Sequence, residues 1–257
     1  MLGTLRVMLG ALLGFSGLIA SPLFGQANFE SASSFVVLTR ITTDQSDDAP
    51  LAEHRTVFHD DVVYDWSQTS SPFRTIVDFE KQEIVLLDCQ HEIRTTLAMS
   101  SLLREASRLM AEVTDSETRT RLGMTAEVQA TAKHQVRIDF PGVSYEVTTA
   151  RAKHETHQRQ FSRYVDWLCR LTMIRPSGLP PFARMTLNDY LAAHDLIATN
   201  TRLSVRQTDA DVMVYHSQCD FQDSLDPVVQ DQLQRTQAMR VTYRSVSLQE
   251  FNEATQS

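Results

Sequence analysis

Short runs of β-branched and large apolar residues, separated by brief polar connectors, dominate residues 73–97. Three runs follow one another there, FRTIVDF, EIVLLD and EIRTTL, joined by the connectors EKQ and CQH. Runs of this length and composition, bounded by polar turns, are typical of an antiparallel meander. The pattern therefore predicts three sequential antiparallel strands, around which the rest of the chain is organised.

The middle run, 84–87, is apolar at every position. Because successive side chains of a strand point to opposite faces of the sheet, this strand needs apolar cover on both faces. We therefore expect a packed layer on each side, or a cavity for an apolar ligand. The residues expected to line such a cavity are Val77, Phe79, Ile84 and Leu86.

Other β-rich runs precede the meander without any helical pattern between them, which favours an antiparallel sheet. A proline–glycine pair, Pro141 and Gly142, marks the turn of a later hairpin. Beyond the meander, strands are expected at 34–43, 54–58, 62–66, 128–140, 143–150, 201–207, 212–218 and 240–247.

Apolar residues recur at helical spacing in three segments, 100–114, 156–173 and 187–197. A fourth helix is expected in the polar, glutamine-rich segment 226–238, with Pro227 in its first turn. We expect Ser100 or Ser101 to cap the first helix, and Thr186 to cap the third. The first helix is the expected cover for the middle strand, and the tail from Asn252 is expected to fray. The predicted fold class is α+β, a single domain with a curved antiparallel sheet, or half-barrel, and helices on its concave face.

The first 27 residues have the form of a secretory signal peptide. Arg6 supplies a positive charge, residues 7–20 are uncharged and mostly apolar, and small residues occur before a cut near Ala27. This pattern predicts an exported protein, periplasmic or extracellular, with an uncleaved N-terminal anchor as the alternative. No later segment is apolar over the length of about 20 residues that a membrane helix needs.

Charge and glycine content exclude several classes of function. The chain carries a formal net charge of −8, which disfavours nucleic acid as a partner because phosphate binding needs a basic surface. After residue 27 the glycines are isolated, at Gly123, Gly142 and Gly178, so phosphate-binding loops and the GxSxG nucleophile motif are absent. The sequence therefore predicts no cofactor and no recognised catalytic residue.

Two weak candidates for chemistry remain. His154 and His157 can share a helix face, with Glu155 as a nearby base, but the zinc-protease motif requires histidines four residues apart. A metal site and a solvated polar turn are thus both open. His216 and Cys219 are a possible nucleophile pair near the end of a strand.

The cysteines leave a second question open. They are odd in number, and their spacing fits no zinc motif. One disulfide with one free thiol, or three buried thiols, are both compatible with Cys89, Cys169 and Cys219.

The meander resembles the repeating hairpins of periplasmic lipoprotein-carrier proteins and related exported half-barrels, some without assigned activity. The resemblance rests on an I-x-D run at 76–78 and an L-L-D run at 86–88, within 34–97. It implies an unclosed antiparallel barrel, helices on its concave side, and an acyl-chain pocket between them. The expected function is therefore non-enzymatic binding of a lipid or other apolar ligand. An exported hydrolase and an envelope protein-interaction module are the alternatives.

Overall fold

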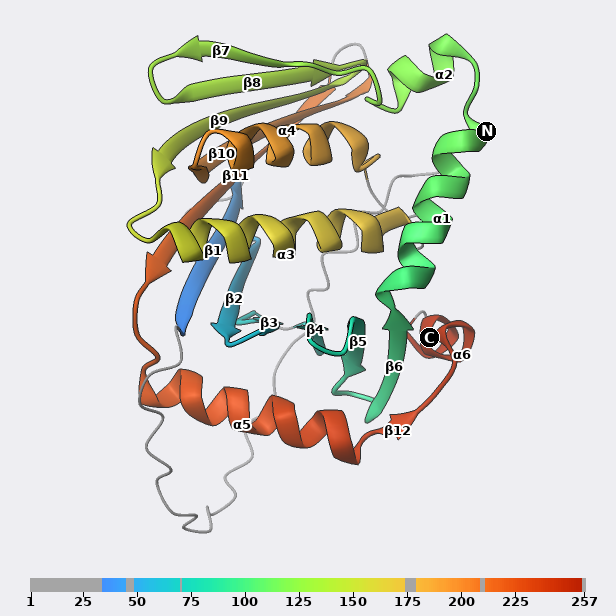
Figure 1. The fold of residues 1–257 in the computed structure, drawn as a ribbon, viewed down its shortest axis with the longest axis vertical. Coiled ribbons are helices and arrows are strands. Elements are labelled where there is room, and N and C mark those ends of the chain that lie inside the picture. The colour runs from blue at the N-terminus through green and yellow to red at the C-terminus, as the bar shows by residue number, and fades with distance from the viewer. Residues whose placement is uncertain (1–33, 45–48, 70, 174–178, 209–210, 256–257) are drawn as a thin grey trace.

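The computed structural model describes residues 34–44, 49–69, 71–173, 179–208 and 211–255. The predicted signal peptide, with its cut near Ala27, lies outside the described residues. Within them, twelve strands form one open sheet (Figure 1). The strands are β1 (Phe35–Thr43), β2 (Ala52–His59), β3 (Val62–Ser67), β4 (Phe73–Asp78), β5 (Glu83–Asp88), β6 (Ile93–Ala98), β7 (Val128–Ala132), β8 (Gln135–Phe140), β9 (Val143–Arg151), β10 (Leu196–Thr208), β11 (Asp211–Gln222) and β12 (Arg244–Ser245). The helices are α1 (Met99–Glu112), α2 (Ser116–Arg121), α3 (Glu155–Met173), α4 (Phe182–Ala193), α5 (Pro227–Thr242) and α6 (Leu248–Ala254).

The sheet is antiparallel except at one edge, which confirms the predicted α+β class. Its strand order is β12-β6-β5-β4-β3-β2-β1-β11-β10-β9-β8-β7, and β12 pairs with β6 in parallel. The first six strands form one continuous meander, as the sequence predicts. The pairing of β1 with β11 joins this meander to the later strands.

Helices cover both faces of the sheet. The inner face is the one that α3 and α4 cover, and the outer face is the one that α5 covers. On the inner face, α3 and α4 lie across the strands in Figure 1, and α3 forms one apolar core with β1–β6, α1 and α6. A further inner core joins α4 to β8–β10. On the outer face, α5 covers β1–β5. The predicted placement of helices on one face is therefore incomplete, because α5 lies on the other.

The apolar middle strand is packed on both faces. Ile84 and Leu86 belong to the inner core, whereas Val85 and Leu87 belong to the outer core beneath α5. All four are at most 3% exposed. The expectation of cover on each side is thus confirmed, and packed layers supply it.

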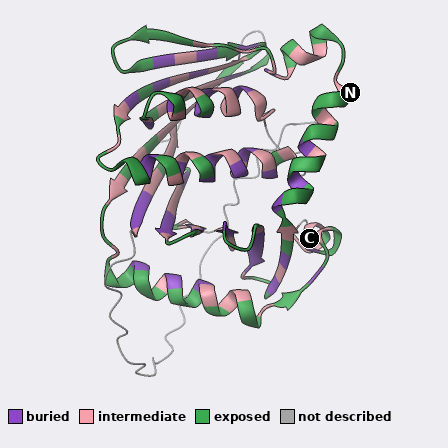
Figure 2. Cartoon of the chain, in the orientation of Figure 1, coloured by how far each residue is buried: buried purple, intermediate pink, exposed green. Residues whose placement is uncertain are grey.

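The contribution of α1 to this cover is smaller than predicted. Its first half is buried through Met99, Leu102 and Ala106, whereas Leu103 and Met110 remain 44% and 40% exposed. Figure 2 shows the second half of α1 mostly exposed. The helix runs past the sheet edge, so only its first turns meet the strands.

The aspartates of the I-x-D and L-L-D runs have a structural role, because each one holds the turn that follows it. Oδ1 of Asp78 accepts a hydrogen bond from the backbone N–H of Lys81 at 2.9 Å. Oδ1 of Asp88 accepts from the N–H groups of the second and third residues beyond it, at 2.8 and 3.2 Å. Both turns end on a left-handed residue, Gln82 or Glu92, with φ of 54° and 52°. The repeated motif therefore encodes a repeated hairpin turn.

Replacing Asp88 with alanine is expected to destabilise the protein by about 2 kcal/mol, because two turn N–H groups and the His91 ring lose their acceptor. Chemical denaturation at pH 7 measures the loss. The control is Glu80→Ala at an exposed position of the preceding turn, with an expected change within about 0.5 kcal/mol. Equal effects of the two variants would contradict this role of Asp88.

Two predicted helix caps are wrong. The backbone of Ala98 precedes α1 directly, without a side-chain cap, because buried Met99 continues from β6 into the helix. Ser100 therefore lies inside α1. Pro181 precedes α4, so Thr186 lies within that helix, which spans Phe182–Ala193 and not 187–197. In both cases the helix begins without a side-chain cap.

Two predicted strands are also wrong. The segment 128–140 is a hairpin of β7 and β8 that turns at left-handed His134, φ 67°. The segment 240–247 is not one strand. Its first residues belong to α5, which continues to Thr242, and its only strand, β12, spans two residues. The tail expected to fray from Asn252 instead begins with the last turn of α6, a helix that the fully buried Phe251 anchors. No described helix is both long and apolar enough to span a membrane.

Candidate functional site

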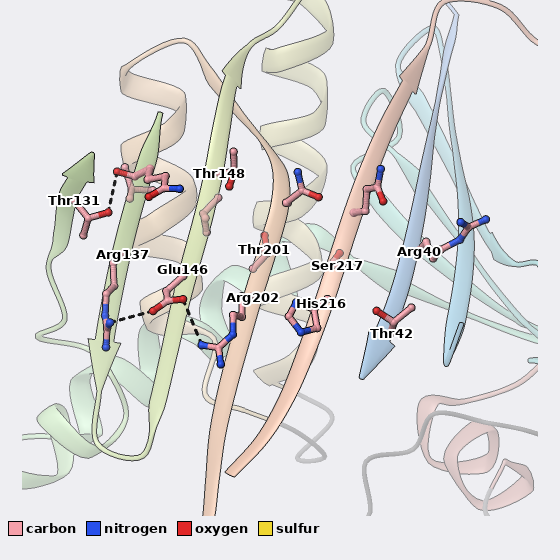
Figure 3. A pocket seen from close by; sticks show the side chains of 15 residues that line it. Arg40, Thr42, Thr131, Arg137, Glu146, Thr148, Thr201, Arg202, His216 and Ser217 are labelled. Atoms are coloured by element: carbon pink, nitrogen blue, oxygen red, sulfur yellow. Dashed lines mark hydrogen bonds and ion pairs between the residues drawn. The ribbon is translucent and has the colours of Figure 1, made fainter. Parts of the chain in front are cut away.

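A polar trough lies on the outer face of the sheet, beyond the part that α5 covers (Figure 3). In β8 and β9, apolar side chains such as Val136 and Val147 enter the inner core, and the alternate residues face outward. The trough has a volume of about 520 Å³. It is lined by Arg40, Thr42, Thr131, Gln135, Val136, Arg137, Glu146, Val147, Thr148, Asn200, Thr201, Arg202, His216, Ser217 and Gln218.

A row of charged residues crosses the trough, one from each neighbouring strand. Arg137, Glu146, Arg202 and His216 are successive cross-strand partners on β8, β9, β10 and β11. Glu146 lies between two arginines, 3.0 Å from Nη1 of Arg137 and 3.4 Å from Nη1 of Arg202. Nε2 of His216 lies 2.6 Å from Oδ1 of Asp44. The contacts of Glu146 with both arginines, and of His216 with Asp44, thus hold the side chains of this row in place.

A second row, parallel to the first, consists of neutral hydrogen-bonding groups. Gln135, Thr148, Asn200 and Gln218 are successive partners on the same strands, and Arg40 of β1 follows Gln218. All four neutral residues are exposed. Among the described residues, none is hydrogen-bonded to the side-chain amides of Gln135, Asn200 or Gln218. Each amide offers both donors and an acceptor to a ligand.

The trough continues into a second hollow of about 400 Å³ towards α5. The two share Arg40 and Gln218. The second hollow is lined by Leu38, Thr39, Arg40, Glu53, His54, Arg55, Gln68, Gln218 and Asp220. Nε of Arg40 donates to Oε1 of Glu53 at 2.8 Å, which orients the arginine between the hollows.

The residues predicted to line an apolar cavity lie elsewhere. Val77, Phe79, Ile84 and Leu86 are all buried in the inner core, with exposed fractions of 0–6%. They pack with α1, α3 and α6, and neither hollow is lined by any of them. The structure therefore assigns these four residues to the packed core.

The two predicted metal candidates do come together at the start of α3. His154 and His157 have ring centroids 4.7 Å apart, and each approaches Oδ1 of Asp223 to 3.8 Å. Lys153 also pairs with Asp223, so a cation already neutralises this carboxylate. Over the described ranges, no group of three or more His, Cys, Asp or Glu side chains has an arrangement that could hold a metal ion.

His157 is expected to make stability depend on pH. Burial lowers its pKa first, and neighbouring His154 and Lys153 lower it further, against an opposing effect of Asp223. Because the folded pKa lies below the unfolded value of about 6.5, the stabilising contribution is complete above that pH. It is lost as pH falls from about 6.5 towards the folded pKa. The His157→Phe variant keeps a ring against Phe35 and removes this loss.

Urea denaturation of both proteins between pH 7.5 and pH 5 measures the difference. His54 acts with the opposite sign, because its hydrogen bond to Asp65 raises its pKa, but its effect cancels between the two proteins. The control His194→Phe, at an exposed position of α4, should keep the wild-type profile. If His157→Phe loses stability on acidification as steeply as the wild type, His157 is not the group responsible.

The proposed nucleophile pair is separated by the sheet. His216 faces the outer trough, whereas Cys219 packs against the inner core and contacts Thr39, 3.7 Å from its Sγ. Residues three apart on a strand point to opposite faces, which explains the separation. Cys89, Cys169 and Cys219 are all free thiols, and burial raises the pKa of the last two.

The polar trough was not predicted from the sequence. The alternation of β9, with Ser144, Glu146 and Thr148 on one face, is visible in the sequence and indicates one wet face. That signal does not say which strands are neighbours. Arg40 and Arg137, nearly a hundred positions apart, line the same trough only because β1 pairs with β11.

Comparison with known proteins gives no family assignment. No protein-family model matches the chain, and no curated protein matches it. Among solved structures, the chain is similar to that of PNGF-II in the P21 space group, with a TM-score of 0.37 and 6% sequence identity. The alignment covers 86% of this chain and 33% of that chain, so this chain spans about a third of that protein's length. This likeness carries no argument about function.

Proposed function

We propose that this protein is a non-enzymatic binding protein whose ligand is polar and occupies the trough on the outer face of the sheet. The observation that carries the proposal is the row of uncommitted amides at Gln135, Asn200 and Gln218. These groups project from strands that the sheet holds rigid, so a ligand meets donors and acceptors already in position.

The charged row supports binding rather than proton transfer. Glu146 and His216 are each engaged by a counter-charge, at 3.0 Å from Arg137 and 2.6 Å from Asp44. Both side chains are thus held by protein partners, whereas a general acid or base has to reach the proton of its substrate directly.

A panel of polar solutes tests the proposal. Protein-observed NMR with sugars, sugar acids, amino acids and nucleotides should reveal a solute that shifts amide signals of β8–β11 and β1. The double variant Asn200→Ala/Gln218→Ala should weaken that binding about thirtyfold, since two lost hydrogen bonds of about 1 kcal/mol each sum to about 2 kcal/mol. Gln234→Ala, an exposed glutamine on α5, is the matched control. Shifts confined to other parts of the molecule would overturn the proposal.

Binding of an acyl ligand between the sheet and helices is the second candidate, and Arg184 of α4 favours it. Burial raises the pKa of the Cys169 and Cys219 thiols and of the Tyr145 hydroxyl, and the charge of Arg184 opposes all three rises. Arg184 thus lies on the inner side, and no described residue is hydrogen-bonded to its buried Nη1. A carboxylate is the group that satisfies such an atom best.

Native mass spectrometry separates the two candidates. If the protein binds an acyl ligand, then protein expressed with its N-terminal segment and purified without detergent should carry an extractable fatty acid. The Arg184→Gln variant should have lost that fatty acid. The same spectrum tests the proposed export, because cleavage near Ala27 shortens the chain by 27 residues. A bare polypeptide that takes up no fatty acid would remove the acyl candidate.

A further inference from the structure

We propose that the ligand of the trough is an acidic oligosaccharide, a hydroxyl-rich chain with carboxylate groups, that crosses the strands from β8 to β2 and places a carboxylate on Arg55. This inference rests on the proposed polar-ligand function and names its ligand class.

The shape of the site fits a chain molecule. The trough and the second hollow share Arg40 and Gln218, so they form one groove across β8, β9, β10, β11, β1 and β2. Neighbouring strands lie about 4.8 Å apart, which gives the groove a length of about 24 Å. An extended ligand can therefore meet one side chain from each strand in succession.

The neutral row of the groove matches hydroxyl groups. A hydroxyl both donates and accepts, and a side-chain amide presents two donors and an acceptor carbonyl. Gln135, Asn200 and Gln218 lie in one line with Thr148 between the first two. A sugar chain laid along this line meets a suitable partner at each strand.

Arg55 is the residue at which a carboxylate of the ligand is expected to bind. Its Nε and Nη1 are buried and form no hydrogen bond with any residue that the structure describes, although the side chain keeps 23% of its surface exposed. The carboxylate of Asp226 is 3.9 Å from Nη1, beyond hydrogen-bond distance, and its other oxygen caps α5. The exposed part of the Arg55 side chain lines the second hollow, where a ligand carboxylate can approach the guanidinium more closely than Asp226 does.

The charge of the groove differs from that of the whole chain. Its lining contains four arginines and three carboxylates, whereas the formal net charge of the protein is −8. This slight positive excess favours a ligand with scattered carboxylates. A dense polyanion such as nucleic acid would meet the unfavourable carboxylates of Glu53, Glu146 and Asp220.

A peptide is less well matched to the groove. Peptides that bind sheets add to a free strand edge and place side chains in pockets. The groove instead crosses strands that are hydrogen-bonded on both sides, from β9 to β1. Of the apolar residues along it, Val136 and Val147 are buried in the inner core, so they offer no side-chain pocket.

Calorimetric titration of the full protein with short oligomers of galacturonic acid tests the inference, beside neutral glucose oligomers of equal length and short polyglutamate. Galacturonate oligomers should bind about tenfold more tightly than the neutral oligomers, and Arg55→Gln should remove that advantage. Arg206→Gln, an exposed arginine of β10 outside the groove, should leave it unchanged. If Arg55→Gln fails to fold, Arg40→Gln is the second variant, because its side chain is 64% exposed. It should likewise reduce the preference for galacturonate oligomers.

The possible failures are distinguishable. Equal binding of neutral and acidic oligomers, with Arg55→Gln without effect, would overturn the carboxylate assignment and leave the polar-ligand function intact. Polyglutamate binding as tight as galacturonate binding would overturn the assignment to saccharides. Absence of binding by every oligomer would overturn this inference, and the solute panel would then decide the proposed function separately.

Discussion

Replacing Phe58 with alanine is expected to lower the free energy of unfolding by about 4 kcal/mol, because the loss of a buried aromatic ring leaves a cavity as well as losing its transfer energy. Phe58 is 1% exposed at the centre of the inner core. Its ring stacks on Phe35 with centroids 4.2 Å apart and meets the edge of Tyr164 at 5.7 Å. Urea or guanidinium denaturation at pH 7 measures the change.

The matched control is Phe182→Ala at the first position of α4, where the ring is partly exposed and belongs to none of the three core clusters. Its expected cost is about 1 kcal/mol. Circular dichroism should show that the Phe58 variant keeps its native spectrum before unfolding. A cost below about 1.5 kcal/mol for Phe58→Ala would mean that the stacked rings contribute little to the stability of the inner core.

Replacing Arg240 with alanine is expected to cost about 3 kcal/mol, because it leaves the buried carboxylate of Asp78 with only the more distant and exposed Lys81, 3.9 Å away. Arg240 of α5 donates to Asp78 at 2.7 Å and to Glu83 at 2.6 Å, and the Asp78 side chain is 3% exposed. The pair fastens α5 to the outer face of the meander. The control Arg235→Ala, on the same helix, removes an ion pair to Asp231 that is exposed, so its expected cost is at most about 0.5 kcal/mol.

The pH dependence of this variant provides a second test. Burial acts to raise the pKa of Asp78, but hydrogen bonds from the Lys81 N–H and from Arg240 together bring it below its ordinary value. The ionised Asp78 therefore stabilises the wild type above the unfolded pKa of about 3.9, and this contribution is lost as pH falls through the folded pKa. The gap between wild type and Arg240→Ala should be widest near pH 7 and narrow below about pH 4. A gap independent of pH would show that Arg240 acts by packing alone.

The sequence was most informative where the physics is local. The apolar run at 84–87 predicted cover on both faces of one strand, and the stripe of α3 predicted a buried helix whose Trp167 is 8% exposed. It was least informative at helix ends, where α1 and α4 begin directly after Ala98 and Pro181 and not at the apparent caps. The functional candidates taken from sequence proximity fared similarly. His216 and Cys219 lie close in the chain but face opposite sides of the sheet.

The sequence by itself determined the antiparallel α+β class, the meander at 73–97 and the need for cover on both faces of its middle strand, since alternation along a strand records its faces. Only the tertiary structure decided which strands became neighbours. The pairing of Arg40 with Gln218, and of Arg202 with Glu146, depends on contacts between segments distant in the chain. The trough exists because that pairing aligns polar residues from separate strands on one face, and because α5 covers only part of that face.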